Sequence, residues 1–280
     1  MPLNVSAVLG ISGGVALLLV TIAVTAANPI NFLNLPGALI VVGGTIAASL
    51  VTYSFADLRR AVGRFIMLLK REHIAGTEDI DQLVRVAGLM LSGKVKAIED
   101  EIHRAHSPFV KTGLQLLVDG MPPDDIGNVL ELRMKRQEEI EHNDAAVFKM
   151  MATYTPAFGM AATLIGLVNM LRLMGVGATP QQVGLNMGLA LVATFYGLVL
   201  ANAILRPIAT KIEKKTQDRM RFMAAIVEAL RCIGEGRGPG HVREILYAIA
   251  SSPDNELGRR DTLPPTADKD LYGNLGRPAT

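Results

Sequence analysis

Charged side chains are absent from two long stretches of this 280-residue chain, and this pattern limits its fold more than any other feature. No Asp, Glu, Lys or Arg precedes Asp57, and Arg172 is the only charged residue between Lys149 and Arg206. A helix needs about 20 apolar residues to cross the hydrocarbon core of a bilayer, so each stretch is long enough for two crossings. The hydrophobic share of 50% likewise favours a membrane protein.

We therefore predict an all-α membrane protein with four transmembrane helices in two hairpins and a helical cytoplasmic insert between helices 2 and 3. The predicted spans cover roughly residues 5–27, 34–55, 148–174 and 183–207. Short polar joints rich in Asn, Gly, Pro and Gln separate the two members of each pair, as expected for tight turns between helices.

The expected domain organisation follows the charge pattern. Apolar residues recur at helical spacing in the insert, and the end of the chain is polar and rich in Pro, Gly and Asp. The predicted segments are a transmembrane hairpin at 1–56, a cytoplasmic helical domain at 57–147, a second transmembrane hairpin at 148–210, cytoplasmic C-terminal helices at 211–252 and a disordered tail at 253–280.

The basic residues predict the orientation in the membrane. Lys and Arg cluster after predicted span 2, before span 3 and after span 4, whereas both short turns are uncharged. Because basic flanks stay in the cytoplasm, we expect both termini there, in a multi-pass membrane protein. The first residues lack the basic region of a secretory signal, so we expect no cleavage.

Several function classes are disfavoured. The net charge is only +2 and basic residues alternate with acidic ones, which leaves no basic face for nucleic acid. The single cysteine, Cys232, is expected to be a buried thiol in a reducing compartment. We find no phosphate-binding loop and no convincing metal-ligand spacing among the histidines, so we expect no enzyme activity, cofactor or metal.

The predicted spans carry no Asp, Glu, His or Lys at bilayer depth. Proton relays in membranes need such groups, so a second polypeptide must supply the acid if this chain conducts a cation. Spans 3 and 4 are rich in small residues, which lets helix backbones pack closely and predicts helical neighbours.

Four residues in these two spans are candidates for function. Thr163 and Thr194 lie mid-span among small residues, although a membrane Thr more often bonds its own backbone carbonyl. Pro156 lies near the start of span 3 and Pro207 near the end of span 4. Pro156 either occupies a first helical turn or, like Pro207, frees carbonyls and makes a bend that moves; the spacing leaves both readings open.

Several short sequences together resemble the MotA/PomA family of flagellar stator subunits over about residues 5 to 250. They are LIVVGGT at 39–45, LLVDG at 116–120, TPAFGM at 155–160 with TLIGLV at 163–168, and ATFYG at 193–197 with PIA at 207–209. Each is weak alone, but their order and spacing on a two-plus-two topology form a strong signal.

The resemblance implies a ring of five such A-type subunits around two B-type (MotB/PomB-like) subunits, whose membrane helix carries a cation-binding Asp. Thr163 and Thr194 would face that Asp, and Pro156 and Pro207 would occupy positions tied to torque. The translocated ion would be H⁺ or Na⁺. Asn34 replaces an Asp of sodium-type relatives, whereas Thr163 is a hydroxyl that they share, so the choice of ion stays open.

The resemblance also implies that the insert contacts the rotor protein FliG through charged residues. Residues 91–93 are Leu-Ser-Gly where family members often carry basic residues, which shifts the basic half of this contact along the chain. The candidate contact residues are Glu99, Asp100, Glu101, Lys94 and Lys96.

Two alternatives compete with a flagellar stator. An ExbB/TolQ-like energiser of outer-membrane transport has three spans with its large insert after the first, and the charge-free residues 1–56 argue against it. A non-conducting membrane scaffold predicts that a bulky apolar residue in place of Thr194 leaves motility intact.

Overall fold

The structure is a computed structural model that describes residues 5–26, 28–69, 77–105 and 107–250. Every regular element in these ranges is a helix. The described residues form two compact units, one from 5–69 with 131–220 and the other from 77–130 with 221–250. The predicted disordered tail at 253–280 lies outside the described residues.

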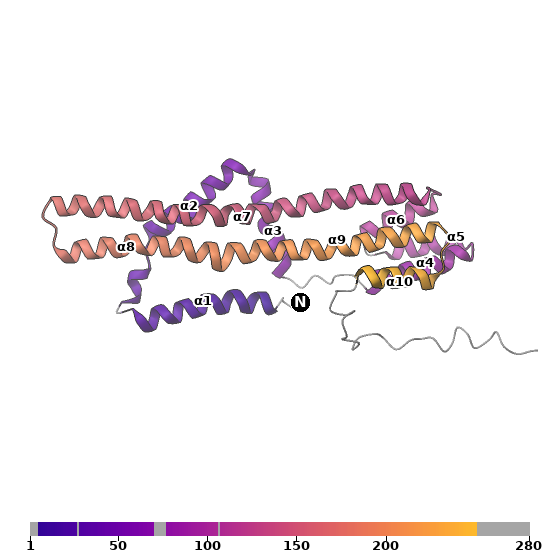
Figure 1. The fold of residues 1–280 in the computed structure, drawn as a ribbon, viewed down its shortest axis with the longest axis horizontal. Helices are drawn as coiled ribbons and strands as arrows, with labels where there is room; N and C mark the ends of the chain where they lie inside the picture. Colours follow the sequence, from indigo (N-terminus) through magenta and orange to yellow (C-terminus); the bar gives the residue numbers. More distant parts are fainter. Residues whose placement is uncertain (1–4, 27, 70–76, 106, 251–280) are drawn as a thin grey trace, which may run out of the picture. The chain divides into compact units, whose positions relative to one another are not determined.

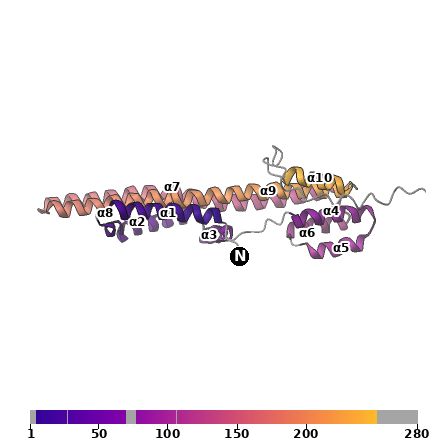
Figure 2. The same cartoon turned by 90° about the horizontal axis from the view of Figure 1, so that it is seen from below.

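The first unit contains the apolar helices. Its elements are α1 (Val5–Thr25), the 3₁₀ turn η1 (Pro29–Phe32), α2 (Leu35–Thr52), α3 (Phe55–Leu69), most of α7 (Pro123–Gly175), α8 (Pro180–Val199), the π-helical turn η2 (Leu200–Leu205) and the first half of α9 (Arg206–Gly234). Within this unit α7 and α8 run side by side (Figures 1 and 2). Three helical stretches of the described chain are long and apolar enough to cross a membrane, Leu35–Thr52, Pro123–Gly175 and Pro180–Gly234.

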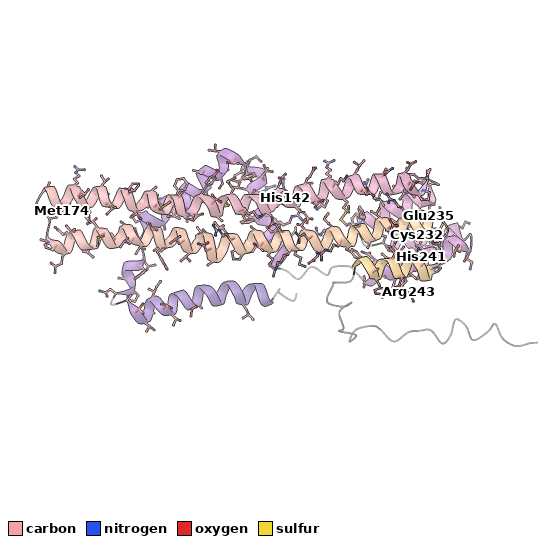
Figure 3. All side chains as sticks on the ribbon, viewed as in Figure 1. His142, Met174, Cys232, Glu235, His241 and Arg243 are labelled. Atoms are coloured by element: carbon pink, nitrogen blue, oxygen red, sulfur yellow. The ribbon has the colours of Figure 1, made fainter. Side chains whose placement is uncertain are left out.

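A tight turn joins α7 to α8. The backbone N–H of Gly177, at φ +84°, and that of the next residue bond to the carbonyls of Met174 and Leu173, which closes the last turn of α7. Figure 3 labels Met174 at this end of the helix. Thr179 then caps α8, because its hydroxyl accepts from the Gln182 N–H while the Gln182 side chain accepts from the Thr179 N–H.

The first unit has a hydrophobic core where α3, α7 and α9 meet. Ala145, Phe148, Ile208 and Ile212 are buried there, and the rings of Phe65 and Phe148 meet edge to face with centroids 6.2 Å apart. The apolar inner side of α3 is thereby fixed on α7.

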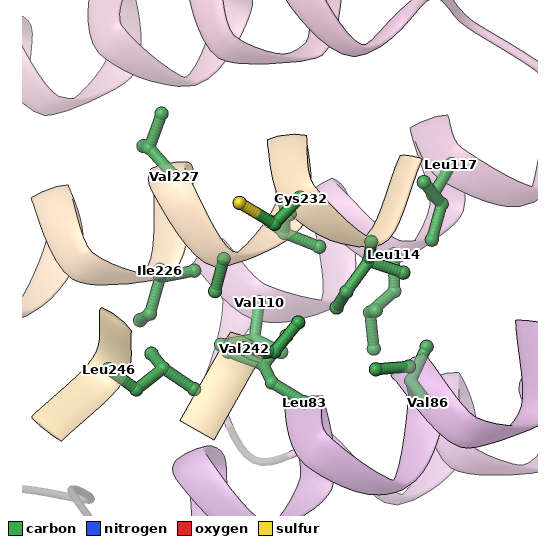
Figure 4. Packing of buried hydrophobic residues seen from close by; sticks show 14 of the residues in the cluster. Leu83, Val86, Val110, Leu114, Leu117, Ile226, Val227, Cys232, Val242 and Leu246 are labelled. Atoms are coloured by element: carbon green, nitrogen blue, oxygen red, sulfur yellow. The ribbon is translucent and has the colours of Figure 1, made fainter. Parts of the chain in front are cut away.

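The second unit is a helical domain with its own core. It contains α4 (Thr77–Leu91), α5 (Val95–Arg104), α6 (Pro108–Val118), α10 (Pro239–Ala250), the first turns of α7 and the end of α9. Leu83, Leu114, Ile226 and Leu246 are fully buried between these helices (Figure 4). Cys232 lies in the same core, which confirms its predicted burial, and this burial raises the pKa of its thiol.

The helical insert is confirmed, since α3 to α6 account for the regular structure of its described residues before α7. Beyond predicted span 4, the helix continues, because α8, η2 and α9 follow one another without a break to Gly234. The reading of Pro156 as a first-turn residue is wrong: it lies in the interior of α7, which begins at Pro123.

Candidate functional site

The backbones of α7 and α8 touch at two glycines. A Cβ atom added to Gly197 would lie 2.9 Å from the carbonyl oxygen of Thr155 and 3.3 Å from the Cα of Gly159. A Cβ atom added to Gly159 would lie 3.2 Å from both the carbonyl oxygen of Ala193 and the Cα of Thr194. Only residues without a side chain permit this approach, which agrees with the small-residue packing predicted for these helices.

The close approach brings Thr163 and Thr194 together although they lie 31 positions apart in the chain. Their hydroxyl groups are in hydrogen-bonding contact with each other. The Thr163 hydroxyl oxygen is 3.1 Å from the carbonyl oxygens of Gly159 and Ala190, and the Thr194 hydroxyl oxygen is also 3.1 Å from that of Gly159. We call these two hydroxyl and two carbonyl oxygens the four-oxygen cluster.

The chemistry of the four-oxygen cluster is that of a neutral oxygen site. Hydroxyl and carbonyl oxygens are ligands for hard cations, and a Thr hydroxyl both donates and accepts hydrogen bonds. Neither hydroxyl titrates at ordinary pH, so the cluster cannot itself hold and release a proton as a carboxylate does. Among the described residues, no three His, Cys, Asp or Glu side chains are grouped so as to hold a metal ion.

Each candidate proline interrupts helical hydrogen bonding, Pro156 beside the close contact with Gly197 and Pro207 beside a π-helical turn. Pro156 has no N–H to donate to the carbonyl four residues earlier, and its Cα lies 3.3 Å from the position of a Cβ added to Gly197. Pro207 follows η2, in which the Arg206 N–H donates to the carbonyl of Ala201, five residues earlier. A π-helical turn widens the helix and often lies at functional positions.

A second pair of buried hydroxyls, which the sequence analysis missed, joins α2 to α7. The Thr45 hydroxyl donates to Thr155 at 3.2 Å, and both side chains are buried. Ser49, one turn along α2, is fully buried on the same face and bonds back to the Thr45 carbonyl. The only available signal was the i, i+4 spacing of two hydroxyl residues within an apolar span.

The candidate rotor residues on α5 differ in exposure. Glu99, Asp100 and the lysines at its start, Lys94 and Lys96, are exposed. Glu101 is buried: its carboxylate lies 3.2 Å from Arg85 and 3.5 Å from Arg104, and its carbonyl accepts from the Gln82 amide at 2.6 Å. Beside these residues is an open cavity of about 430 Å³ lined by Arg85, Ser92, Asp100, Glu101 and Arg104 among others.

A buried ionic cluster in the first unit also escaped the sequence analysis. Asp144 is fully buried and accepts from the Nε atoms of Arg60 and Arg64, each at 2.8 Å. Glu141, one turn earlier on α7, accepts from Arg64 at 3.1 Å and Arg219 at 2.7 Å. The hydrogen bond with Asp144 raises the pKa of Arg60. This cluster connects α3, α7 and α9.

Comparisons with known proteins agree on one family. A family model described as the MotA/TolQ/ExbB proton channel family matches residues 101–225. Motility protein A of Aquifex aeolicus is 30% identical over 248 residues, covering 86% of this chain and 94% of that protein. Chemotaxis protein PomA of Vibrio alginolyticus is 28% identical over 241 residues, covering 85% of this chain and 91% of that protein.

Two solved structures share the fold. A chain of C. jejuni MotAB matches with a TM-score of 0.82 at 23% identity, covering 91% of this chain and 99% of that chain. A chain of the flagellar MotAB stator complex from Bacillus subtilis matches with a TM-score of 0.81 at 23% identity, covering 89% of this chain and 97% of that chain.

Proposed function

Because the chain belongs to the MotA/PomA family and is an A-type subunit of the flagellar stator, which couples cation flow to torque, we propose that its α7–α8 pair lines the cation path. The observation that carries this proposal is the four-oxygen cluster around Thr163 and Thr194. It gathers polar oxygens within the predominantly apolar stretches of α7 and α8, where polar groups are costly unless they serve structure or transport.

The proposed topology has four membrane helices. To the three stretches long and apolar enough to span, it adds α1, which has 21 residues and no charged side chain. The basic residues that follow α2 and α8 support a cytoplasmic location for α3 to α6, α9 and α10, and for both termini, in the inner membrane. Labelling of single cysteines placed at Gly177 and Ser92 by a membrane-impermeant reagent tests this orientation, with only the first labelled in intact cells.

The partner supplies the acid in this proposal. The predicted spans of this chain carry no carboxylate at bilayer depth, and related solved structures are MotAB complexes. We place an Asp of a MotB/PomB-like subunit against the four-oxygen cluster, within a ring of five A-type chains. Cation binding neutralises that carboxylate, which changes how the partner helix packs against α7 and α8 and advances the ring by one step.

We propose sodium as the first candidate for the coupling cation. Four neutral oxygens beside one carboxylate resemble the all-oxygen coordination of hard cations, and Thr163 adds a ligand that an Ala or Val at this position would lack. The description of the matching family as proton channels supports the proton as the second candidate. A proton needs the partner's carboxylate but no ring of oxygen ligands.

The experiment compares the two cations directly. Cells expressing the chain with its B-type partner as their stator are tracked while external sodium is varied at constant pH, and again with a proton uncoupler. A sodium-driven motor gains speed with sodium and keeps swimming in the uncoupler. Thr163→Ala and Thr194→Ala should raise the sodium concentration that gives half-maximal speed, and unchanged curves for both would refute the proposed path.

The rotor contact is proposed for the exposed charges of α5. Glu99, Asp100, Lys94 and Lys96 are exposed and available to FliG, whereas Glu101 is buried and supports the helix from within. The relatives named Motility protein A and Chemotaxis protein PomA favour this function over the ExbB/TolQ-like alternative, which energises a different process.

A further inference from the structure

The turn between α1 and α2 is tied to α8 by hydrogen bonds centred on Asn34. The Asn34 side-chain nitrogen donates to the Leu189 carbonyl at 2.6 Å, and the Asn34 backbone N–H donates to the Tyr196 hydroxyl at 2.9 Å. That hydroxyl in turn donates to the carbonyl of Phe32. We call this arrangement of Asn34, Tyr196 and the Leu189 and Phe32 carbonyls the Asn34 clasp.

Asn34 is held by side-chain hydrogen bonds within the protein. Its side chain is buried, and its side-chain oxygen accepts from the Gly37 N–H at 3.0 Å, which caps α2. Both polar side-chain atoms therefore have protein partners. The clasp joins residues 155 and 162 positions apart, so it fixes tertiary structure and not merely a local turn.

The clasp holds one side of α8 while the neighbouring side carries the four-oxygen cluster. The row that faces the α2 turn, at helical spacing, consists of Leu189, Ala193 and Tyr196. The row that faces α7 consists of Ala190, Thr194 and Gly197. Contact on the first row is close, since a Cβ atom added to Gly37 would lie 2.9 Å from the Cβ of Ala193.

Thr194 therefore lies between the two attachment points of the clasp, five residues after Leu189 and two before Tyr196. A helix is stiff over this length, so fixing both points fixes its rotation about its own axis and its height along α7. A rotation of α8 that released the clasp would also move the Thr194 hydroxyl relative to Gly159 and Thr163.

We propose that Asn34 and Tyr196 are positioning residues for the cation path: they hold Thr194 in the register that completes the four-oxygen cluster. This inference rests on the proposed function of that cluster. It assigns the outer end of α2 a role in ion coupling that does not require Asn34 to touch the cation.

The test uses the whole stator, expressed with its B-type partner in motile cells. Asn34→Ser keeps a capping hydroxyl for α2 but removes the donor to Leu189. Tyr196→Phe keeps the ring but removes the hydroxyl. Tyr154→Phe is the matched control, because it also removes one interhelical hydroxyl contact, the 3.3 Å contact with Thr52, but leaves α8 untouched. Thr194→Ala serves as the reference for a lost ligand.

Speed is recorded against the concentration of the coupling cation, sodium or proton, together with membrane abundance. We expect Asn34→Ser, which removes one hydrogen bond, to raise the half-saturating concentration about threefold, the factor that corresponds to one membrane hydrogen bond of average strength. Tyr196→Phe removes two hydrogen bonds and should raise it by at least as much. The double variant should shift it by less than the product of the single shifts, because either change releases the same helix. A merely structural role would lower abundance and leave the half-saturating concentration unchanged.

The outcomes separate the two proposals. If Thr194→Ala shifts the curve while both clasp variants behave like Tyr154→Phe, the positioning role is overturned and the cation path stands. If Thr163→Ala and Thr194→Ala both leave the curve unchanged, the path itself is refuted and the clasp has nothing to position. Should Asn34→Ser fail to accumulate, Tyr196→Phe decides alone, since it retains the packing of the ring.

Discussion

Gly197 offers the sharpest test of the α7–α8 contact. In Gly197→Ala the new Cβ atom would lie 2.9 Å from the Thr155 carbonyl oxygen and 3.3 Å from the Cα atoms of Gly159 and Pro156. All three atoms belong to the backbone of α7, so no side chain can rotate away. The two helices must separate by about 0.6 Å to restore a contact of about 3.5 Å.

The structure gives the size of the effect. A gap of this order forfeits about a quarter to a half of the dispersion energy of the affected contacts, and overpacking of this kind costs about 1–3 kcal/mol. The same displacement would lengthen the 3.1 Å contact between the Thr194 hydroxyl and the Gly159 carbonyl to a distance beyond hydrogen bonding. Stability and ion coupling should therefore fall together.

The assay is thermal unfolding of the purified stator in detergent, paired with swimming speed. Gly188→Ala is the control, because Gly188 also lies in α8 but a Cβ atom there meets nothing within 4 Å. We expect a lower Tm and slow or absent swimming for Gly197→Ala, and little change for the control. Equal Tm values for the two variants would refute the close-contact argument.

Three further outcomes concern buried side chains and the exposed Glu99. Asp144→Asn should destabilise the first unit by about 2–3 kcal/mol. This is less than the cost of breaking a fully buried ion pair, about 3–5 kcal/mol, because both arginines reach solvent. A Tm equal to that of the unchanged protein would contradict this expectation. Burial raises the pKa of Cys232, so the protonated thiol contributes to the stability of the fold at pH values below the ordinary thiol pKa, and this contribution is lost as the pH rises through the raised pKa. The thiol of the folded protein should therefore resist alkylation at pH 7.5 and react once the chain is unfolded. Glu99→Lys should impair swimming and leave the Tm unchanged, whereas Glu101→Gln should lower the Tm because it weakens the ion pair with Arg85. The reverse pattern would exclude a rotor role for Glu99 and a structural role for Glu101.

Much of the fold could be read from the sequence because lipid leaves the backbone few choices. Every backbone N–H and C=O needs a partner in lipid, and a continuous apolar stretch of this length meets that need within itself by forming a helix. The helical period then predicted a helical insert, and the presence of a single cysteine predicted that Cys232 is buried. The small residues of spans 3 and 4 correctly indicated close helical neighbours, although not which residues would meet.

The partners of individual side chains were beyond the sequence. The helical period predicts on which face of its helix each of Thr163 and Thr194 lies. How far α7 and α8 are shifted along each other decides whether the two hydroxyls meet. Pro156 is compatible with a helix start or a helix interior until the length of α7 is known. The sequence around Glu101 resembles the sequence around Glu99, and only the packing of the helices, with the ion pair to Arg85, buries Glu101.

The amino-acid sequence by itself determined that this chain is helical and apolar enough for a membrane, and it predicted that a second polypeptide supplies the carboxylate for a cation, because these inferences depend on composition and local spacing. Tertiary structure alone decided the four-oxygen cluster and the Asn34 clasp. Each joins backbone and side-chain atoms from segments far apart in the chain, and the relative rotation and height of packed helices are fixed by contacts that no local pattern records.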